Sequence, residues 1–465
     1  MKKCITLTQT VYKFKSKALH FSLTSMVYLL NILINKNFKR PEPYYGNYLL
    51  GLNIIPKSGD NYFELDASWN KTYVMFSKGE YQNGVRIRKE IMHEIYEKNG
   101  ISNYDYFPPI LSKWFTGAIG HHQEIGVHIA AQKLGFLPKG QRYLQVAKKD
   151  RNKPFYSSIK EDINLVSFSN LHNSDEPPGM WHIYERMQLV RTHDGFIDHL
   201  ELAEKVYVES ELNSDESILK LDMDYVQKSI SELKSYGLKE SDWFVTLHVR
   251  DAGNHKEHNS QSISSYIKSI EHIINLGGKV IRIGDTLMPR LPEIPGLIDL
   301  SQNSVTSSHL HLYALGAAKF FIGTQSGPRA VPPLFKVPSL ITNVTHIGNS
   351  TFHYSKDTLY IPKNAYVSKK LLSFQDIINS PIGYGSFRPI DMKENNILFE
   401  PNTEDQILSG VKEMFNIVFN KVHPRNFALD NKINEIRKQV DFATTGLFST
   451  QWLEVNQSFF LPNSQ

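Results

Sequence analysis

Cysteine is nearly absent from this 465-residue chain, in which Cys4 is the single example. A disulfide framework and a cysteine-based metal cluster are therefore excluded, and a reducing, cytoplasmic location fits best. Long apolar runs are lacking as well. The segment 18–34 is interrupted by polar residues such as His20 and Asn31, and it falls short of the roughly 20 apolar residues that a membrane span needs. We expect no transmembrane helix there.

Several well-known ligand-binding motifs are also missing. The chain has no G-x-G-x-x-G fingerprint and no G-x-x-x-x-G-K-[ST] P-loop, which disfavours NAD-dependent and ATPase functions. The G-x-S-x-G elbow of hydrolases is absent, because residues 323–327 read GTQSG. His121, His122 and His248 lack a third ligand at metal-site spacing, so we expect no metal site.

Acidic residues are absent from residues 1–40, which carry eight Lys or Arg side chains. The whole chain has a net charge of +5, so the rest of it carries −3. Nucleic-acid binding is not expected, because proteins with that function spread basic residues over a groove face. Leu19, Leu23 and Leu30 share one helical face, which leaves two interpretations open. The segment is either packed on the protein or disordered, or it contacts an anionic inner membrane peripherally.

The length of the chain predicts more than one domain. We expect a basic segment and connector at residues 1–70, an N-terminal α/β domain at 71–238, and a C-terminal α/β domain with terminal helices at 239–465. In the N-terminal part, the pattern predicts a strand at Lys71–Lys78, a helix at Val85–Lys98, and a glycine-containing turn that leads into a helix ending near Leu134.

From Ser241 onward, strands and helices alternate, which is typical of a doubly wound parallel sheet. The expected strands are Trp243–His248, Lys279–Ile283, Leu297–Leu300, Lys319–Ile322, Val337–Ile341 and Thr358–Ile361.

Ligands of such sheets bind beyond the carboxyl ends of the strands. His248–Asp251 follow the first expected strand, Gly284 and Asp285 follow the second, and Gly323–Gly327 follow the fourth. The glycines would let backbone approach a ligand, and hydroxyls would stand where a helix is expected to begin.

The guanidinium of Arg250 needs an anionic partner at the end of a buried strand, and a diphosphate is the natural one. Other interpretations stay open. Arg250 and Asp251 also fit a structural ion pair, residues 323–327 fit a plain tight turn, and Arg282 and Arg329 are either further cations of the site or solvated surface residues.

Four runs of residues resemble a family of bacterial glycosyltransferases: WFVTLHVRD at Trp243–Asp251, GGKVIRIGD at Gly277–Asp285, LPEIPGLIDLS at Leu291–Ser301 and FFIGTQSGP at Phe320–Pro328. GAIGHHQEIG at Gly117–Gly126 resembles the glycine-histidine turn of the same family. HVRD followed by a late FIGTxSG loop is distantly similar to the fucosyltransferase branch of the GT-B enzymes. The resemblance implies two Rossmann-type domains that face a cleft, with the acceptor on the N-terminal side and the nucleotide sugar on the C-terminal side.

Residue roles follow from the resemblance. Arg250 would bind the diphosphate, and Thr324 and Ser326 would contact its β-phosphate. Asp285 would lie near the base or ribose, and Glu400 would bind a ribose. The base for the acceptor hydroxyl would come from His121, His122 or Glu124, with Asp251 as the rival. The expected donor-binding set is completed by His248, Arg282, Gly284, Gly323, Gln325 and Gly327.

The resemblance therefore implies transfer of a sugar from a GDP- or UDP-linked donor to a cell-envelope glycan or lipid-linked acceptor, as in lipopolysaccharide, O-antigen or capsule-type biosynthesis. Neither a metal nor another cofactor is expected. Two alternatives stay open: a non-catalytic nucleotide- or glycan-binding module of the same fold, and an enzyme that uses another phosphorylated donor, such as a sulfotransferase.

Overall fold

The computed structural model describes residues 68, 71–72, 75, 80–98, 110–111, 119–137, 142–145, 152–167, 189–192, 195–213, 216–251, 261–302, 308–345, 357–378, 396–423, 425, 427–438 and 447–459. The expectations for residues 1–40 lie outside these ranges.

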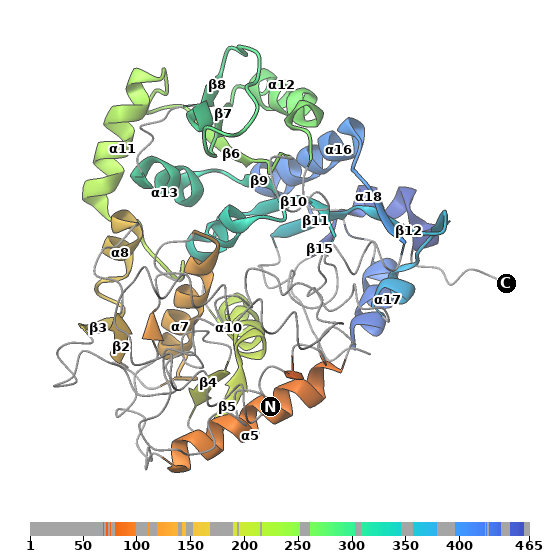
Figure 1. Cartoon of the computed structure of the whole chain (residues 1–465). Coiled ribbons are helices and arrows are strands. Elements are labelled where there is room, and N and C mark those ends of the chain that lie inside the picture. The colour runs from red at the N-terminus through yellow and green to blue at the C-terminus, as the bar shows by residue number, and fades with distance from the viewer. Residues whose placement is uncertain are drawn as a thin grey trace, which may run out of the picture.

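A seven-stranded parallel sheet forms the centre of the C-terminal part, in the order β15-β11-β10-β9-β6-β7-β8 (Figure 1). Its strands are β6 (Phe244–His248), β7 (Lys279–Arg282), β8 (Leu297–Asp299), β9 (Phe321–Thr324), β10 (Ser339–Val344), β11 (Thr358–Pro362) and β15 (Leu447–Phe448). The chain winds outward from β6 in one direction and from β9 in the other. The α/β class and the doubly wound C-terminal sheet are therefore confirmed.

Helices cover this sheet, which explains why its central strands are apolar along their whole length. Every residue of β6 and of β9 is buried. Helices α12 (Ile267–Asn275) and α16 (Glu404–Phe415) contact each other and strands β7, β10 and β11, whereas α13 (Ser308–Ala317) contacts β6 and α11 (Met223–Ser235) (Figure 1). Thr403 begins α16 with a capping box that it forms with Gln406.

The N-terminal part contains a second, smaller parallel sheet in the order β1-β2-β3. Its elements are α5 (Tyr81–Lys98), β1 (Ile110–Leu111), η3 (Ile119–His121), α7 (His122–Lys133), β2 (Arg142–Gln145), α8 (Lys153–Ile159), β3 (Asn164–Ser167), β4 (Leu189–Thr192), β5 (Gly195–Asp198) and α10 (His199–Asn213). Strands β4 and β5 form an antiparallel pair. The expected strand at Lys71–Lys78 is wrong, because residues 71, 72 and 75 are helical. There the Thr72 hydroxyl accepts a hydrogen bond from Arg88 Nε of α5 at 2.7 Å, so tertiary contacts outweigh strand propensity.

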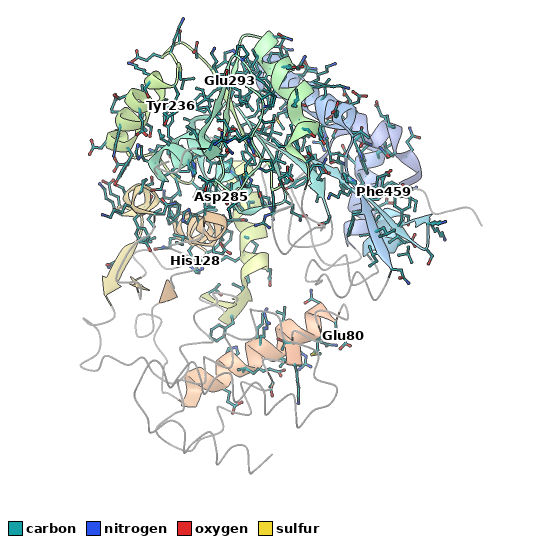
Figure 2. All side chains as sticks on the ribbon, turned by 45° about the horizontal axis from the view of Figure 1, so that its top comes forward. Glu80, His128, Tyr236, Asp285, Glu293 and Phe459 are labelled. Atoms are coloured by element: carbon teal, nitrogen blue, oxygen red, sulfur yellow. The ribbon has the colours of Figure 1, made fainter. Side chains whose placement is uncertain are left out.

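Helix α7 lies between the outer helix α5 and the large sheet (Figure 1). Figure 2 shows the same arrangement, with His128 of α7 between Glu80 and the side chains of the C-terminal part. At Gly126 of α7, an added Cβ would stand 2.3 Å from a methyl carbon of Leu334, so the helix packs closely on the sheet layer. Buried residues on both sides of residue 239 form one connected hydrophobic cluster. The domain boundaries stay a prediction.

The remaining C-terminal elements are short helices, turns and a small antiparallel sheet that lie outside the large sheet. They are η6 (Ile263–Tyr266), η7 (Leu300–Gln302), η8 (Gly327–Ala330), η9 (Pro332–Phe335), β12 (Asn364–Val367), β13 (Lys370–Leu371), α14 (Phe374–Ile378), β14 (Ile397–Glu400), the π-turn η11 (Asn416–Asn420), α17 (Phe427–Lys438), α18 (Thr450–Val455) and η12 (Gln457–Phe459). Among the helices that the structure describes, none is both long enough and apolar enough to cross a membrane.

Candidate functional site

The carboxyl ends of β6 and β9 meet at the point where the winding of the sheet reverses. His248 and Gly323 are paired across these strands. One step further along, the backbone N–H of Arg250 donates to Thr324 Oγ1 at 3.0 Å. Two loops that lie far apart in the sequence are therefore joined at the edge where parallel sheets bind ligands.

His248 and Ser326 form a second link between the same two loops. Their Nδ1 and Oγ atoms are 2.9 Å apart, and both side chains are 6% exposed. Burial lowers the pKa of His248 to about 3, and the charges of Arg250, His311 and Arg282 add to this effect. The imidazole is therefore neutral at physiological pH. It holds the Ser326 hydroxyl in place through a hydrogen bond and contributes no charge.

Arg250 is half-buried, as is Arg329 in η8. The carbonyl of Arg250 accepts the Gln261 N–H at 2.9 Å, and among the described residues no carboxylate pairs with its guanidinium. The neighbouring Asp251 carboxylate instead accepts the N–H of Ile263 at 3.0 Å, at the start of η6. The alternative of an Arg250–Asp251 ion pair therefore does not hold, and Asp251 serves as a cap.

Arg282 is not a solvated surface residue. Its side chain is fully buried, and its Nη1 lies 2.8 Å from Asp299 Oδ2 on the adjacent strand β8. The Nε and Nη2 atoms are buried without a hydrogen-bond partner. A guanidinium in this position cannot touch a ligand on the surface, but its charge acts on His248 through the protein.

The glycines of the site allow close packing within the protein, and their role toward a ligand stays a prediction. A Cβ on Gly323 would stand 2.9 Å from the His248 carbonyl oxygen, and one on Gly284 would stand 2.2 Å from the sulfur of Met288. A Cβ on Gly327 would stand 3.1 Å from the backbone nitrogen of Gly120. At Gly323 the close atom belongs to the backbone, which cannot move aside as easily as the flexible Met288 side chain beside Gly284.

The glycine loop is followed by the short 3₁₀ helices η8 and η9 and not by an α-helix. Ser326 is the N-cap of η8, and Pro328 lies in its first turn. Proline has no N–H to donate, so Pro328 adds no donor at this N-terminus. The hydroxyl of Thr324 is fully buried, and its observed contact is with the Arg250 backbone.

The predicted glycine-histidine turn, which belongs to the N-terminal part, lies against the same loop. Turn η3 lies against η8, and a Cβ on Gly120 would stand 2.8 Å from the Cα of Gly327. His121 ends η3, and Glu124 is half-buried in the first turn of α7. His122 is instead part of the core, because its ring stacks on Phe155 at 3.7 Å.

The other predicted site residues lie along the same edge in supporting or exposed positions. Gln325 Oε1 accepts the Thr345 N–H at 2.9 Å. Asp285 is exposed, and its carboxylate accepts the Leu287 N–H at 3.0 Å. Glu400 is exposed on β14, which pairs with β12 outside the large sheet, and its carboxylate accepts hydrogen bonds from Asn364 and Tyr366.

Two further basic side chains were missed by the sequence analysis. Lys363 directly follows β11 and is 3% exposed, and burial lowers its pKa to about 8. The strand-end rule that singled out Arg250 would have found it, since the strand at Thr358–Ile361 was predicted. His311 lies on α13, and burial lowers its pKa to about 4. Nothing in the sequence indicated a role for His311, because the residue lies within a helix and not at the end of a strand.

Charged side chains of both signs lie along this edge. Arg250 and Lys363 follow two of its strands, whereas nearby carboxylates are already engaged: Asp251 and Asp285 with backbone N–H groups, and Asp299 with Arg282. Within the described ranges, no cluster of three His, Cys, Asp or Glu side chains could hold a metal ion. The arrangement is suited to binding an anion.

Comparison with known proteins found no matching protein-family model and no matching curated protein. Among solved structures, the chain is similar to a family 9 glycosyl transferase from Veillonella parvula, with 12% identity over 56% of this chain and 86% of that one and a TM-score of 0.36. It is also similar to the iron-containing dodecameric glycosyltransferase TibC from enterotoxigenic E. coli, with 13% identity over 66% and 77% and a TM-score of 0.34.

A third similar structure is the wall teichoic acid polymerase TagF, with 11% identity over 81% of this chain and 98% of that one and a TM-score of 0.25. At these identities and TM-scores the similarities transfer no function to this chain. None of the three is described as a fucosyltransferase, so that branch stays a prediction.

Proposed function

We propose that this chain is a glycosyltransferase that moves a sugar from a nucleotide-sugar donor to an acceptor hydroxyl. The observation that carries the proposal is the placement of Arg250. The residue is half-buried at the winding reversal, its backbone N–H donates to Thr324 Oγ1, and no described carboxylate pairs with its guanidinium. A guanidinium can donate two parallel hydrogen bonds to a pair of oxygens on one anion, and the diphosphate of a nucleotide sugar has such oxygens.

The chemistry requires stabilisation of the leaving group. As the bond between the anomeric carbon and the diphosphate oxygen breaks, negative charge develops on the diphosphate, and a new bond forms to the acceptor oxygen. Arg250 stabilises that charge directly, and the field of Arg282 and Lys363 adds to it, because none of these groups has to reorient. The neutral His248 keeps the Ser326 hydroxyl in place.

The acceptor proton goes to a base on the opposite side of the site. Asp251 is the weaker choice, since one of its oxygens already accepts the Ile263 N–H. Glu124 is the base that we favour, with His121 at the end of η3 as the alternative, because η3 brings the start of α7 against the glycine loop.

The finer assignments are part of the same proposal. The donor is GDP- or UDP-linked, the two α/β units act as in GT-B enzymes without a metal, and the acceptor is a cell-envelope glycan or a lipid-linked glycan. A non-catalytic nucleotide- or glycan-binding module would use the same cations, and it differs in releasing no nucleoside diphosphate from a nucleotide sugar.

The test combines binding and turnover in Arg250 variants. We expect UDP or GDP to raise the melting temperature of the full chain, and a nucleotide sugar to be converted with release of the nucleoside diphosphate. Arg250→Ala should reduce that rate about 100-fold or more while the circular dichroism spectrum is unchanged. Arg250→Lys should restore only part of it, since lysine lacks the forked donors.

The matched control is Arg290→Ala. This arginine lies in the loop after β7, is exposed, and donates to Gln302 at 3.1 Å, so its removal should leave the rate unchanged. A wild-type rate in Arg250→Ala would sink the diphosphate role, and nucleotide binding without any release would assign the chain to the binding-module alternative.

A further inference from the structure

A cavity of about 460 Å³ lies at the opposite edge of the large sheet, where its strands begin. It is lined by Lys319, Pro338 and Asp357, which lie one or two residues before the neighbouring strands β9, β10 and β11. The other wall is the π-turn at the end of α16, through Ile417–Phe419. Since β9 to β11 run from this edge to the candidate site, the two locations lie at opposite ends of the same strands.

The lining of this cavity is basic. Lys319, Lys336, Lys421 and His423 face one carboxylate, Asp357. That carboxylate lies 3.5 Å from His423 Nε2. Across the described part of the chain, neither Lys319 nor Lys421 pairs with a carboxylate. The cavity therefore carries an uncompensated positive charge, which favours an anionic occupant.

Its apolar wall is held rigidly. The Phe419 ring lies 4.5 Å from the ring of Phe415 and 4.7 Å from that of Trp243, and Ile417 is 4% exposed. At the rim, Lys336 and Lys421 both have left-handed backbone conformations, with φ of 54° and 55°. Non-glycine residues adopt this conformation at a cost in free energy, so the two lysines are fixed at the ends of η9 and η11 by the surrounding packing.

We propose that this cavity is a second binding site, which takes a phosphate-bearing ligand separately from the donor site. The lysines at its rim bind the phosphate as point charges, and the wall formed by Ile417–Phe419 contacts the body of the ligand. The volume lies within the range of about 300–1,000 Å³ that is common for small-molecule sites. A soluble phosphorylated compound and the headgroup of an anionic lipid share this chemistry.

The experiment uses the full chain carrying Arg250→Ala, so that the candidate donor site contributes little, and inorganic pyrophosphate as the probe. We expect saturable binding by calorimetry in this background. Adding Lys319→Gln and Lys421→Asn should weaken the affinity at least about tenfold, because two of the cations are lost. Asparagine is chosen because it tolerates the left-handed backbone of residue 421.

The matched control is Lys370→Gln, which removes an exposed lysine on β13, outside the cavity, and should leave the affinity unchanged. Absence of saturable binding in the Arg250→Ala background, or equal affinity with and without the two cavity substitutions, would overturn the proposal. Either result leaves the donor-site test untouched, since that test measures nucleotide turnover.

Vesicles distinguish the two ligand sources. If the natural ligand is a lipid headgroup, Lys319→Gln with Lys421→Asn lowers co-sedimentation with vesicles that contain phosphatidic acid, and pyrophosphate competes in the Arg250→Ala chain. If it is a soluble compound, the two substitutions weaken pyrophosphate binding and leave co-sedimentation unchanged. Both results support the cavity as a phosphate site.

Discussion

A histidine that loses its solvent on folding resists protonation, and His248 is such a residue. Its ring is 6% exposed beneath Arg250 and beside Ser326. A charged imidazole here would face the positive charges of Arg250 and Arg282, so the site is built around a neutral ring. The buried neutral ring makes folding sensitive to acid.

The pH dependence of stability tests this assignment. The unfolded histidine titrates near pH 6.5, whereas the pKa of folded His248 is about 3, so the unfolded chain binds the extra proton between these values. The contribution is complete above pH 6.5 and is lost as the pH falls toward 3. Between pH 6.5 and 4.5, the wild type should lose about 2 kcal/mol more unfolding free energy than His248→Gln.

Urea unfolding at pH 6.5, 5.5 and 4.5 measures this difference. Glutamine does not titrate and can still bond to Ser326 Oγ, so other groups contribute similarly to both curves. Parallel curves for the two proteins would show that His248 is not a buried neutral ring.

At the scale of elements, the contact between η3 and η8 joins the N-terminal part to the glycine loop. Backbone meets backbone there, because Gly120 and Gly327 leave no room for a Cβ on either side. Such a contact cannot relax by rotating a side chain. It therefore fixes the distance between the start of α7 and the Arg250–Ser326 edge, where the proposed base and the proposed leaving group must face each other.

Gly120→Ala should separate these two elements. A Cβ 2.8 Å from the Cα of Gly327 requires a backbone shift, and overpacking of this kind costs about 1–3 kcal/mol. We expect a lower melting temperature together with a fall in kcat/KM of at least about tenfold, since displaced catalytic groups lose rate steeply. Thermal unfolding and nucleoside diphosphate release measure the two effects.

Gly237→Asn is the control for this substitution. Gly237 follows α11, and an added Cβ there would meet nothing within 4 Å, while asparagine tolerates its positive φ. If Gly120→Ala retained the stability and the kcat/KM of this control, the tight contact would have no functional consequence.

Much of the sheet could be predicted from the sequence, because buried strands are apolar and their ends carry the polar residues. The strands expected near Trp243, Lys279 and Thr358 are present, and the meeting of His248–Arg250 with Thr324–Ser326 follows from the order of the strands. β9 begins two residues later than expected, at Phe321. The hydrophobic pattern alone does not determine where a strand begins.

What could not be predicted depends on tertiary contacts. β15 has two residues, too few for any periodic pattern. The burial of Arg282 depends on Asp299, which belongs to another strand. The cavity at the other edge is lined by Lys319, Asp357 and Lys421. The spacing of these residues along the chain follows no recognisable motif. Each of these features appears only when separate segments are placed together.

At the scale of the whole molecule, charge is distributed unevenly. Residues 1–40 lie outside the described part of the chain and carry eight basic side chains and no acidic ones, so the remainder has a net charge of −3. A lipid-linked acceptor would be reached at a membrane surface, and an anionic leaflet attracts basic segments with about 1 kcal/mol per lysine or arginine. The charge distribution therefore favours peripheral contact through the N-terminal segment.

Replacing Lys13, Lys15 and Lys17 together by glutamine tests this contact. Three lysines correspond to about 3 kcal/mol, so the affinity for phosphatidylglycerol vesicles should fall about 100-fold in co-sedimentation. The control replaces three exposed lysines outside residues 1–40, Lys228, Lys239 and Lys370, and changes the net charge equally. If both triple variants lost the same affinity, overall charge and not the N-terminal segment would govern binding. Raising the salt concentration should lower the affinity of the wild type for the vesicles until it matches that of the Lys13, Lys15 and Lys17 variant. The reason is that surface charges are screened within about 10 Å at 0.1 M salt.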